Sequence, residues 1–174
     1  MPAIRLVRLT VAQMRALAAG NRTGPAAELG LALPDELVPS RWWTARADLV
    51  DRDPTDTWSA VRLVVRDGVV VGNTGFHGPP DDAGMVEIGY TVYAAYRRQG
   101  IARAVLGELV AEARASPAAR VVRLSVSPDN EASLGLTRSA GFVQAGEQMD
   151  DEDGLELVFE LPVGPDDPGD RVPA

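Results

Sequence analysis

The chain has 174 residues, enough for one domain with a hydrophobic core, and its 17 basic and 25 acidic residues give a net charge of −8. This balance opposes nucleic-acid binding, and the absence of cysteine excludes disulfides, thiolate metal sites and a cysteine acyl-enzyme. With a single histidine we expect no metal site. The sequence has no apolar run of membrane-spanning length and no signal peptide, so we expect a soluble, cytoplasmic protein.

The first third of the chain is expected to hold one strand and two or three helices. Alternation over Ala3–Leu9 predicts a strand, and Thr10 with Gln13 forms a capping box that opens a helix ending near Gly20. Between residues 21 and 39, Gly and Pro leave room for at most a short helix over Ala26–Leu29. A helix capped by Ser40 is expected from Arg41 to about Val50. Its Trp42 and Trp43 could wall the acceptor pocket, although the default is that at least one of them belongs to the core.

The rest of the chain alternates strands with helices. Asp67-Gly68 is a favoured two-residue turn, which predicts a hairpin between β-rich runs. Apolar periodicity predicts the other elements. In chain order the expected segments are the strands Trp58–Arg66, Val69–Phe76 and Met85–Val92, the helix Ile101–Ala115, the strand Arg120–Ser127, the helix Glu131–Ser139, and the strands Phe142–Met149 and Leu155–Leu161.

The segment Tyr96–Ala102 joins a predicted strand to a predicted helix. Such a turn leaves several backbone N–H groups pointing at one spot, where the helix dipole also favours an anion. Gly100 permits the sharp turn, and Ala102 is small enough for a diphosphate to approach. Arg97, Arg98 and Arg103 add positive charge, although their side chains could instead be solvated surface groups.

Two common phosphate loops do not fit this segment, because it lacks both a Gly-Lys-Ser/Thr ending and three spaced glycines. The spacing of Arg97, Gly100 and Ala102 resembles the acetyl-CoA loop of the GNAT family of N-acetyltransferases. Further signatures resemble the same family, most closely its ribosomal-protein alanine acetyltransferase branch. They are Asn130-x-x-Ser133 followed by Gly141-Phe142, the segment Val71–Phe76, and Glu87-Ile88-Gly89-Tyr90.

The resemblance implies an α/β fold of the α+β type. It would be a single domain, residues 1–161, with a mixed, mostly antiparallel sheet of six to seven strands, flanked by helices and splayed at the two central strands. Residues 162–174, rich in Pro, Gly and Asp, would form a disordered tail. The family places its variable acceptor-binding region at residues 21–39.

The resemblance also implies a function, direct transfer of an acetyl group from acetyl-CoA, the cosubstrate, to a primary amine. The amine would belong to a protein N-terminus or to a small molecule such as an antibiotic or a metabolite. A homodimer is left open. The alternative is a catalytically silent acyl-CoA-binding or interaction domain.

By the same resemblance, the loop backbone holds the diphosphate and the end of the preceding strand pairs with the pantetheine arm. A backbone N–H at or near Val92 would stabilise the oxyanion. Asn130 would hydrogen-bond the pantetheine. The implied cofactor-binding residues are Tyr90, Thr91, Val92, Arg97, Arg98, Gln99, Gly100, Ile101, Ala102, Arg103 and Asn130.

Transfer to an amine needs a base, because a free alkyl amine has a pKa of ~10. Glu87 is the first candidate; alternatively it pairs with a nearby arginine or only orients the acceptor. His77, at the end of the neighbouring strand, is the rival base, or else a half-exposed strand-end residue.

The thiolate leaving group needs a proton donor. Many relatives use a tyrosine seven residues after the asparagine, but this chain has Thr137 there. The candidate acid is therefore Ser133, whose hydroxyl could alternatively bond back to its own helix. Where some relatives carry a carboxylate five residues before the asparagine, this chain has Ser125.

Overall fold

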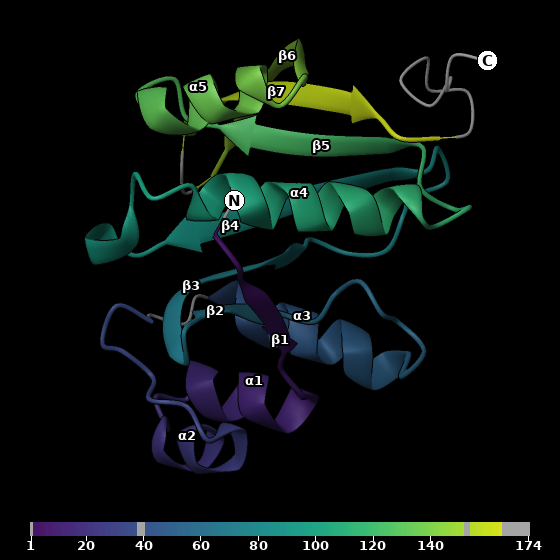
Figure 1. The fold of residues 1–174 in the computed structure, drawn as a ribbon. Coiled ribbons are helices and arrows are strands. Elements are labelled where there is room, and N and C mark those ends of the chain that lie inside the picture. Colours follow the sequence, from purple (N-terminus) through teal and green to yellow (C-terminus); the bar gives the residue numbers. More distant parts are fainter. Residues whose placement is uncertain (1, 38–40, 152–153, 165–174) are drawn as a thin grey trace, which may run out of the picture. The chain divides into compact units, whose positions relative to one another are not determined.

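The structure is a computed structural model that describes residues 2–37, 41–151 and 154–164. Its described part contains seven strands and five α-helices (Figure 1). In chain order they are β1 (Arg5–Arg8), α1 (Val11–Ala18), α2 (Thr23–Leu29), α3 (Arg41–Arg52), β2 (Arg62–Arg66), β3 (Val69–Phe76), β4 (Met85–Val92), a 3-10 turn (Ala94–Tyr96), α4 (Ile101–Arg114), β5 (Val121–Val126), α5 (Glu131–Ser139), β6 (Val143–Asp150) and β7 (Gly154–Pro162).

The strands form a sheet in the order β1-β2-β3-β4-β5-β7-β6. The pairs β1–β2, β2–β3, β5–β7 and β6–β7 are antiparallel, whereas β4 and β5 run parallel. In the parallel pair, Met85–Glu87 of β4 aligns with Val121–Arg123 of β5. The predicted α/β fold with a mixed, mostly antiparallel sheet is therefore confirmed, while the splay of its central strands stays a prediction.

The chain divides into two compact units, each of which is described by itself. The first comprises residues 1–79 and 90–106, and the second comprises residues 80–89 and 107–174. Strand β4 and helix α4 each contribute residues to both units. We call them the first and the second unit.

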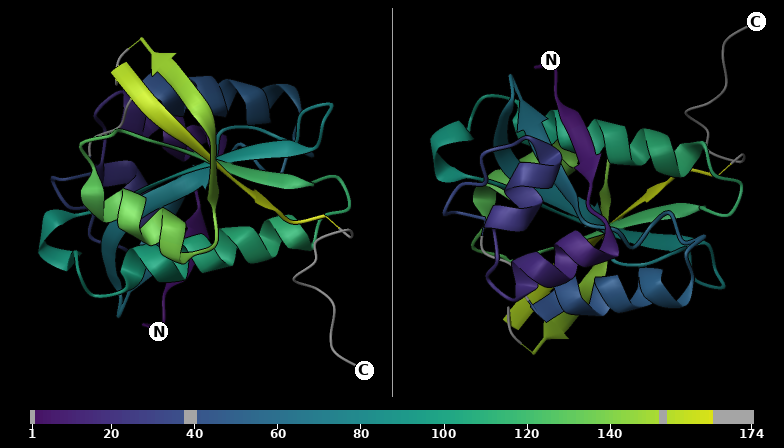
Figure 2. Two further views of the ribbon diagram at one scale, coloured as in Figure 1. Left: turned by 90° about the horizontal axis from the view of Figure 1, so that it is seen from above. Right: turned by 90° about the horizontal axis from the view of Figure 1, so that it is seen from below.

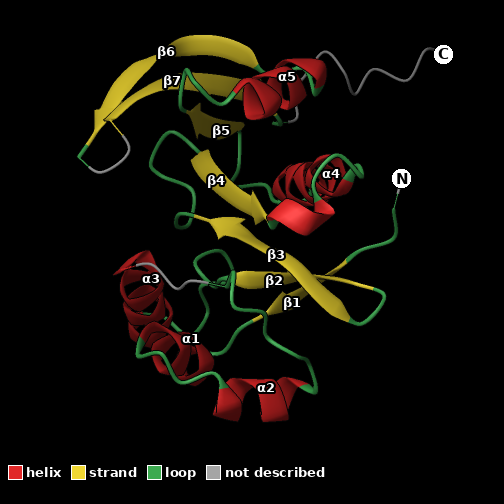
Figure 3. Ribbon diagram, turned by 90° about the vertical axis from the view of Figure 1, so that its left-hand side faces the viewer, coloured by secondary structure: helices red, strands yellow, loops and turns green. Residues whose placement is uncertain are grey.

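In the first unit, α1 and α3 lie side by side and share a hydrophobic core with β1–β3 (Figures 2 and 3). Met14 and Leu17 of α1 and Trp43 of α3 are buried in this core with strand residues such as Leu63. Trp42, in contrast, is about half exposed. The prediction that at least one tryptophan belongs to the core is thus confirmed.

Local signals account for most of the element boundaries in the first unit. The capping box of α1 forms as predicted, with Thr10 N donating to Gln13 Oε1 at 3.0 Å and Gln13 N donating to Thr10 Oγ1 at 3.2 Å. The hairpin turn also forms, with positive φ angles of 51° at Asp67 and 79° at Gly68. The predicted cap of α3, Ser40, lies outside the described residues.

Two predicted boundaries were wrong. The short helix α2 begins at Thr23 rather than Ala26, since Pro25 is tolerated in a first helical turn, where its missing N–H is not needed. Strand β2 begins at Arg62 rather than Trp58, because the backbone N–H groups of Trp58 and Ser59 donate to Asp56 Oδ1 at 2.7 and 3.1 Å. These bonds hold a turn where the sequence predicted a strand.

In the second unit, the apolar faces of the strands and of the C-terminal part of α4 are buried, with Ile88, Leu109 and Phe159 each at most 2% exposed. Strand β7 ends at Pro162, and the next residue, Val163, is buried and donates its backbone N–H to Arg120 O at 2.8 Å. The ordered chain thus continues past the predicted start of the tail at residue 162. Residues 165–174 of that predicted tail lie outside the described residues.

Candidate functional site

The loop between β4 and α4 presents a row of unused backbone donors. In the described part of the chain, the N–H groups of residues 98–102 donate no hydrogen bond, whereas Arg97 N donates to Ala94 O and Ala104 N donates to Gly100 O. Arg98 and Gly100 both adopt positive φ, 60° and 77°. Alternation of left-handed and right-handed backbone turns successive N–H groups toward one concave spot. We call residues 98–102 the anion cradle.

Side chains hold this loop in place. Arg97 Nε donates to Val92 O at 3.1 Å, which ties the loop to the end of β4. Gln99 donates through Nε2 to Ala95 O at 3.2 Å and accepts through Oε1 from Arg66 Nη1 at 2.8 Å. No sequence pattern indicated Arg66, which lies 33 residues from Gln99 along the chain. Arg98 and Arg103 are exposed beside the cradle.

The end of β4 is also positioned by a close approach of β3. A Cβ atom built on Gly72 would overlap the backbone carbonyl oxygen of Thr91, and Tyr93 N donates to Val71 O at 3.0 Å. Only glycine lets the two backbones come this close. The side chains of Tyr90 and Thr91 are half-buried and exposed, respectively. The predicted oxyanion role of the Val92 N–H stays a prediction.

In the first unit, the predicted acceptor-binding segment is organised by one side chain. The Arg22 guanidinium donates to the backbone carbonyls of Pro34 at 2.6 Å, Asp35 at 3.1 Å and Leu37 at 2.8 Å. Residues 38–39 of this segment lie outside the described residues. Arg22 therefore fixes the path of the segment before α3, a role that the sequence pattern does not indicate.

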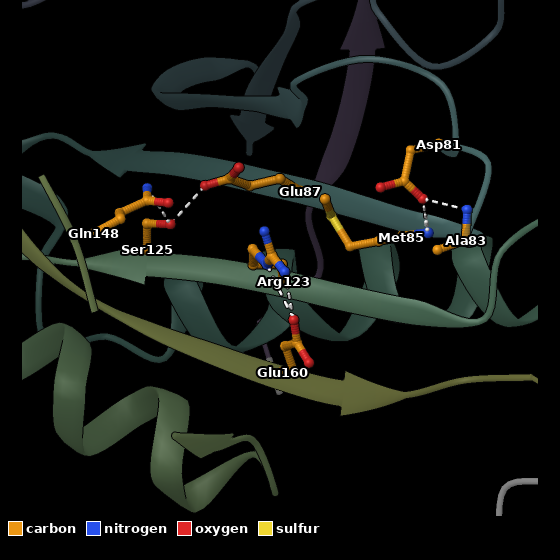
Figure 4. Close-up of polar contacts among 8 residues, drawn as sticks. All are labelled: Asp81, Ala83, Met85, Glu87, Arg123, Ser125, Gln148 and Glu160. Atoms are coloured by element: carbon orange, nitrogen blue, oxygen red, sulfur yellow. Dashed lines mark hydrogen bonds and ion pairs between the residues drawn. The ribbon is translucent and has the colours of Figure 1, made fainter. Parts of the chain in front are cut away.

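In the second unit, Glu87 is half-buried on β4 and belongs to a hydrogen-bonded chain of side chains (Figure 4). Ser125 Oγ donates to Glu87 Oε1 at 2.7 Å. Gln148 Nε2 donates to Ser125 Oγ and to Glu156 Oε2, both at 3.0 Å. We call these four residues the carboxylate network. Sequence reasoning noted Ser125 only as a missing carboxylate and did not identify Gln148 or Glu156.

The arginine that aligns with Glu87 in the strand register has another partner. Arg123 donates to Glu160 Oε1 from Nη2 at 2.6 Å and from Nε at 3.1 Å (Figure 4). The loop before β4 is held by its own side chain Asp81, because Asp81 Oδ1 accepts from the backbone N–H groups of Ala83 at 2.9 Å and Met85 at 2.8 Å. Asp81 thereby fixes the start of the strand that carries Glu87.

At the start of α5, Asn130 acts as the helix cap. Its Oδ1 accepts from Ser133 N at 3.1 Å, and its exposed Nδ2 has no partner among the described residues. The amide N–H groups are therefore available to a ligand. Ser133 is half-buried in the first turn of the helix. His77 is exposed directly after β3 in the first unit, and its predicted proximity to Glu87 stays a prediction.

Two further features concern the described residues as a whole. They include no group of three or more His, Cys, Asp or Glu side chains placed to hold a metal ion. They also include no helix that is both long and apolar enough to cross a membrane.

These features agree with one family. Residues 15–143 match the family described as an acetyltransferase (GNAT) domain, so the chain belongs to the GNAT family. A curated relative, the uncharacterized N-acetyltransferase YjdG of Bacillus subtilis (strain 168), is 29% identical over 99 residues. That match covers 56% of this chain and 59% of the relative, so it spans less than two thirds of the relative's length.

Solved structures show the same fold over nearly the whole chain. A ribosomal-protein-alanine N-acetyltransferase from Brucella melitensis is 28% identical, covers 92% of this chain and 99% of its own, and superposes with a TM-score of 0.60. YncA, a putative acetyltransferase from Salmonella typhimurium solved with acetyl-CoA, is 20% identical over 94% of this chain and 95% of its own, also with a TM-score of 0.60. At 20% identity, the similarity to YncA concerns the fold alone.

Proposed function

We propose that the protein is an acetyl-CoA-dependent N-acetyltransferase that transfers the acetyl group directly to a primary amine. The observation that carries this proposal is the anion cradle, where the backbone N–H groups of residues 98–102 have no partners in the described part of the chain and lie at the N-terminus of α4. A diphosphate is the ligand that this donor set fits, because N–H groups at a helix start favour anions. Family membership adds the acyl donor.

Each part of acetyl-CoA has a candidate partner in this assignment. The cradle backbone and the first turn of α4, through Arg103, would bind the diphosphate. The backbone of Tyr90–Val92 would pair with the pantetheine arm, and Asn130 Nδ2, which has no partner among the described residues, would donate to it. Residues 98–100 of the cradle are exposed, and the side-chain bonds of Arg97 and Gln99 hold the geometry of the loop.

The transfer step assigns roles to three side chains. Glu87, directly or through water, takes the proton from the attacking ammonium group, with His77 as the alternative base. The amine nitrogen then bonds to the thioester carbonyl carbon and the C–S bond breaks. Ser133 gives its hydroxyl proton to the departing sulfur, and the proton that the new amide nitrogen loses returns to Ser133, directly or through water, so that the serine ends neutral. No acyl-enzyme is required, and the chain has no cysteine to form one.

The acceptor is proposed to be the α-amine of a protein N-terminus or a small-molecule amine. The peptide N-terminus is tested first, because the Brucella structure that is 28% identical to this chain carries the name ribosomal-protein-alanine N-acetyltransferase. Small amines such as aminoglycosides are tested second.

The experiment measures release of CoA thiol from acetyl-CoA with a panel of peptides, amines and aminoglycosides. Turnover supports the enzyme, and we expect Glu87→Gln to lower kcat/KM by ~10²-fold, a common contribution of a general base. Ser133→Ala should lower kcat with little change in KM, because its proton transfer occurs in the transition state. Tight CoA binding without turnover across the panel would instead support a silent acyl-CoA-binding domain.

A further inference from the structure

The carboxylate network joins four neighbouring strands in the second unit. Its members are Glu87 on β4, Ser125 on β5, Gln148 on β6 and Glu156 on β7, and all four are half-buried. The bonds from Ser125 to Glu87 and from Gln148 to Ser125 measure 2.7 and 3.0 Å (Figure 4). The bond from Gln148 to Glu156 measures 3.0 Å. The network is thus short and continuous from β7 to β4.

The chemistry of these groups gives the network a direction. An amide NH2 can only donate, so Gln148 Nε2 occupies an acceptor site on Ser125 Oγ. The one hydroxyl proton of Ser125 is then directed to Glu87 Oε1. Glu156, an acceptor when ionised, takes the other amide proton and fixes the plane of Gln148. One amide proton of Gln148 and the hydroxyl proton of Ser125 therefore point along a path that ends at Glu87, while the second amide proton points to Glu156.

We propose that Ser125, oriented by Gln148, is a positioning residue that holds the Glu87 carboxylate in the direction from which it accepts the proton of the acceptor amine. This inference rests on the proposed function, in which Glu87 is the base. A cross-strand role in stability alone does not require it, since the Arg123–Glu160 ion pair already links β5 and β7. The hydroxyl bond matters because a base acts only in a defined geometry.

The kinetic test compares four variants of two residues. We expect Ser125→Ala to lower kcat by ~10-fold, as removal of a hydrogen bond to a charged group does, while KM for acetyl-CoA stays within about twofold. Ser125→Thr keeps the hydroxyl and should restore activity. Gln148→Met removes the bond that orients Ser125 but leaves the hydroxyl able to donate to Glu87, so it should lower kcat by less than Ser125→Ala does. Gln148→Glu offers the hydroxyl proton a competing carboxylate and should resemble Ser125→Ala.

The matched control is Ser116→Ala, in the same unit. Among the described residues, the Ser116 hydroxyl accepts only from Ala118 N, at 3.3 Å, in the turn after α4. This variant should leave kcat unchanged. In a Glu87→Gln background, Ser125→Ala should cause no further loss, because both changes act through one carboxylate. A further tenfold loss in that background would place the role of Ser125 elsewhere and overturn the inference.

A second readout does not depend on activity. The side-chain carboxyl carbon of Glu87, observed by NMR at pH 8 with labelled glutamate, should shift in Ser125→Ala and Gln148→Glu and return in Ser125→Thr. Unchanged resonances and unchanged kcat in Ser125→Ala would refute the positioning role. Full activity of Glu87→Gln would instead refute the base assigned in the proposed function, so the two failures are distinguishable.

Discussion

The anion cradle is tested most directly by Gly100→Val. Gly100 has φ of 77°, a region that costs a residue with a Cβ roughly 1–2 kcal/mol. A Cβ there would meet only the Pro2 side chain, at 3.4 and 3.9 Å, which is ordinary contact, so the fold has room for the new side chain. The strain is instead relieved by rotating residue 100, which turns the N–H groups of residues 100 and 101 away from the cradle.

Each N–H lost from a charged phosphate costs about 1.5–3 kcal/mol, so the Kd for CoA should rise by roughly 10- to 100-fold per lost bond. Calorimetry would measure this, with pantetheine as a comparison ligand that has no diphosphate and should bind both proteins alike. Gly30→Val is the control, since Gly30 has φ of 63°, open space around its Cβ and a position after α2. Unaltered CoA affinity in folded Gly100→Val, or equal loss in Gly30→Val, would refute the cradle.

Three other substitutions test packing by chemical denaturation. Gly72→Ala should destabilise the fold by at least ~2 kcal/mol, because its Cβ would overlap the Thr91 carbonyl. Gly107→Ala, in α4 with open space around its Cβ, should stabilise by ~1 kcal/mol, and a loss would contradict the helix. The buried Tyr93 hydroxyl makes no hydrogen bond with described residues, so Tyr93→Phe should be neutral or stabilising. Burial raises the pKa of the Tyr93 hydroxyl above its ordinary value of 10.0. The wild type therefore keeps its full free energy of unfolding below pH 10.0 and loses part of it as the pH rises through the raised pKa of the folded state. This loss should be absent in Tyr93→Phe, which has no hydroxyl to ionise.

The sequence determined the features that depend on residues close together in the chain. The capping box of α1, the Asp67-Gly68 turn and the bounds of β4 and α5 agree with expectation, because each arises from local hydrogen bonds or periodicity. The cradle belongs to the same class, since a single glycine at the start of a helix sets its geometry. One local signal was overlooked. The Asp56 side chain holds a short turn at Trp58, where a strand was predicted.

Only the tertiary structure decided which side chains support these elements. Arg66 bonds Gln99 across 33 residues and Ser125 bonds Glu87 across 38, so neither partner can be found by spacing along the chain. The Ser125–Glu87 contact depends on strand register, where a shift of one residue would send a side chain to the opposite face of the sheet. The sequence therefore identified Glu87 as a candidate base, but its orienting partners Ser125 and Gln148 emerge only once β4, β5 and β6 are placed in register.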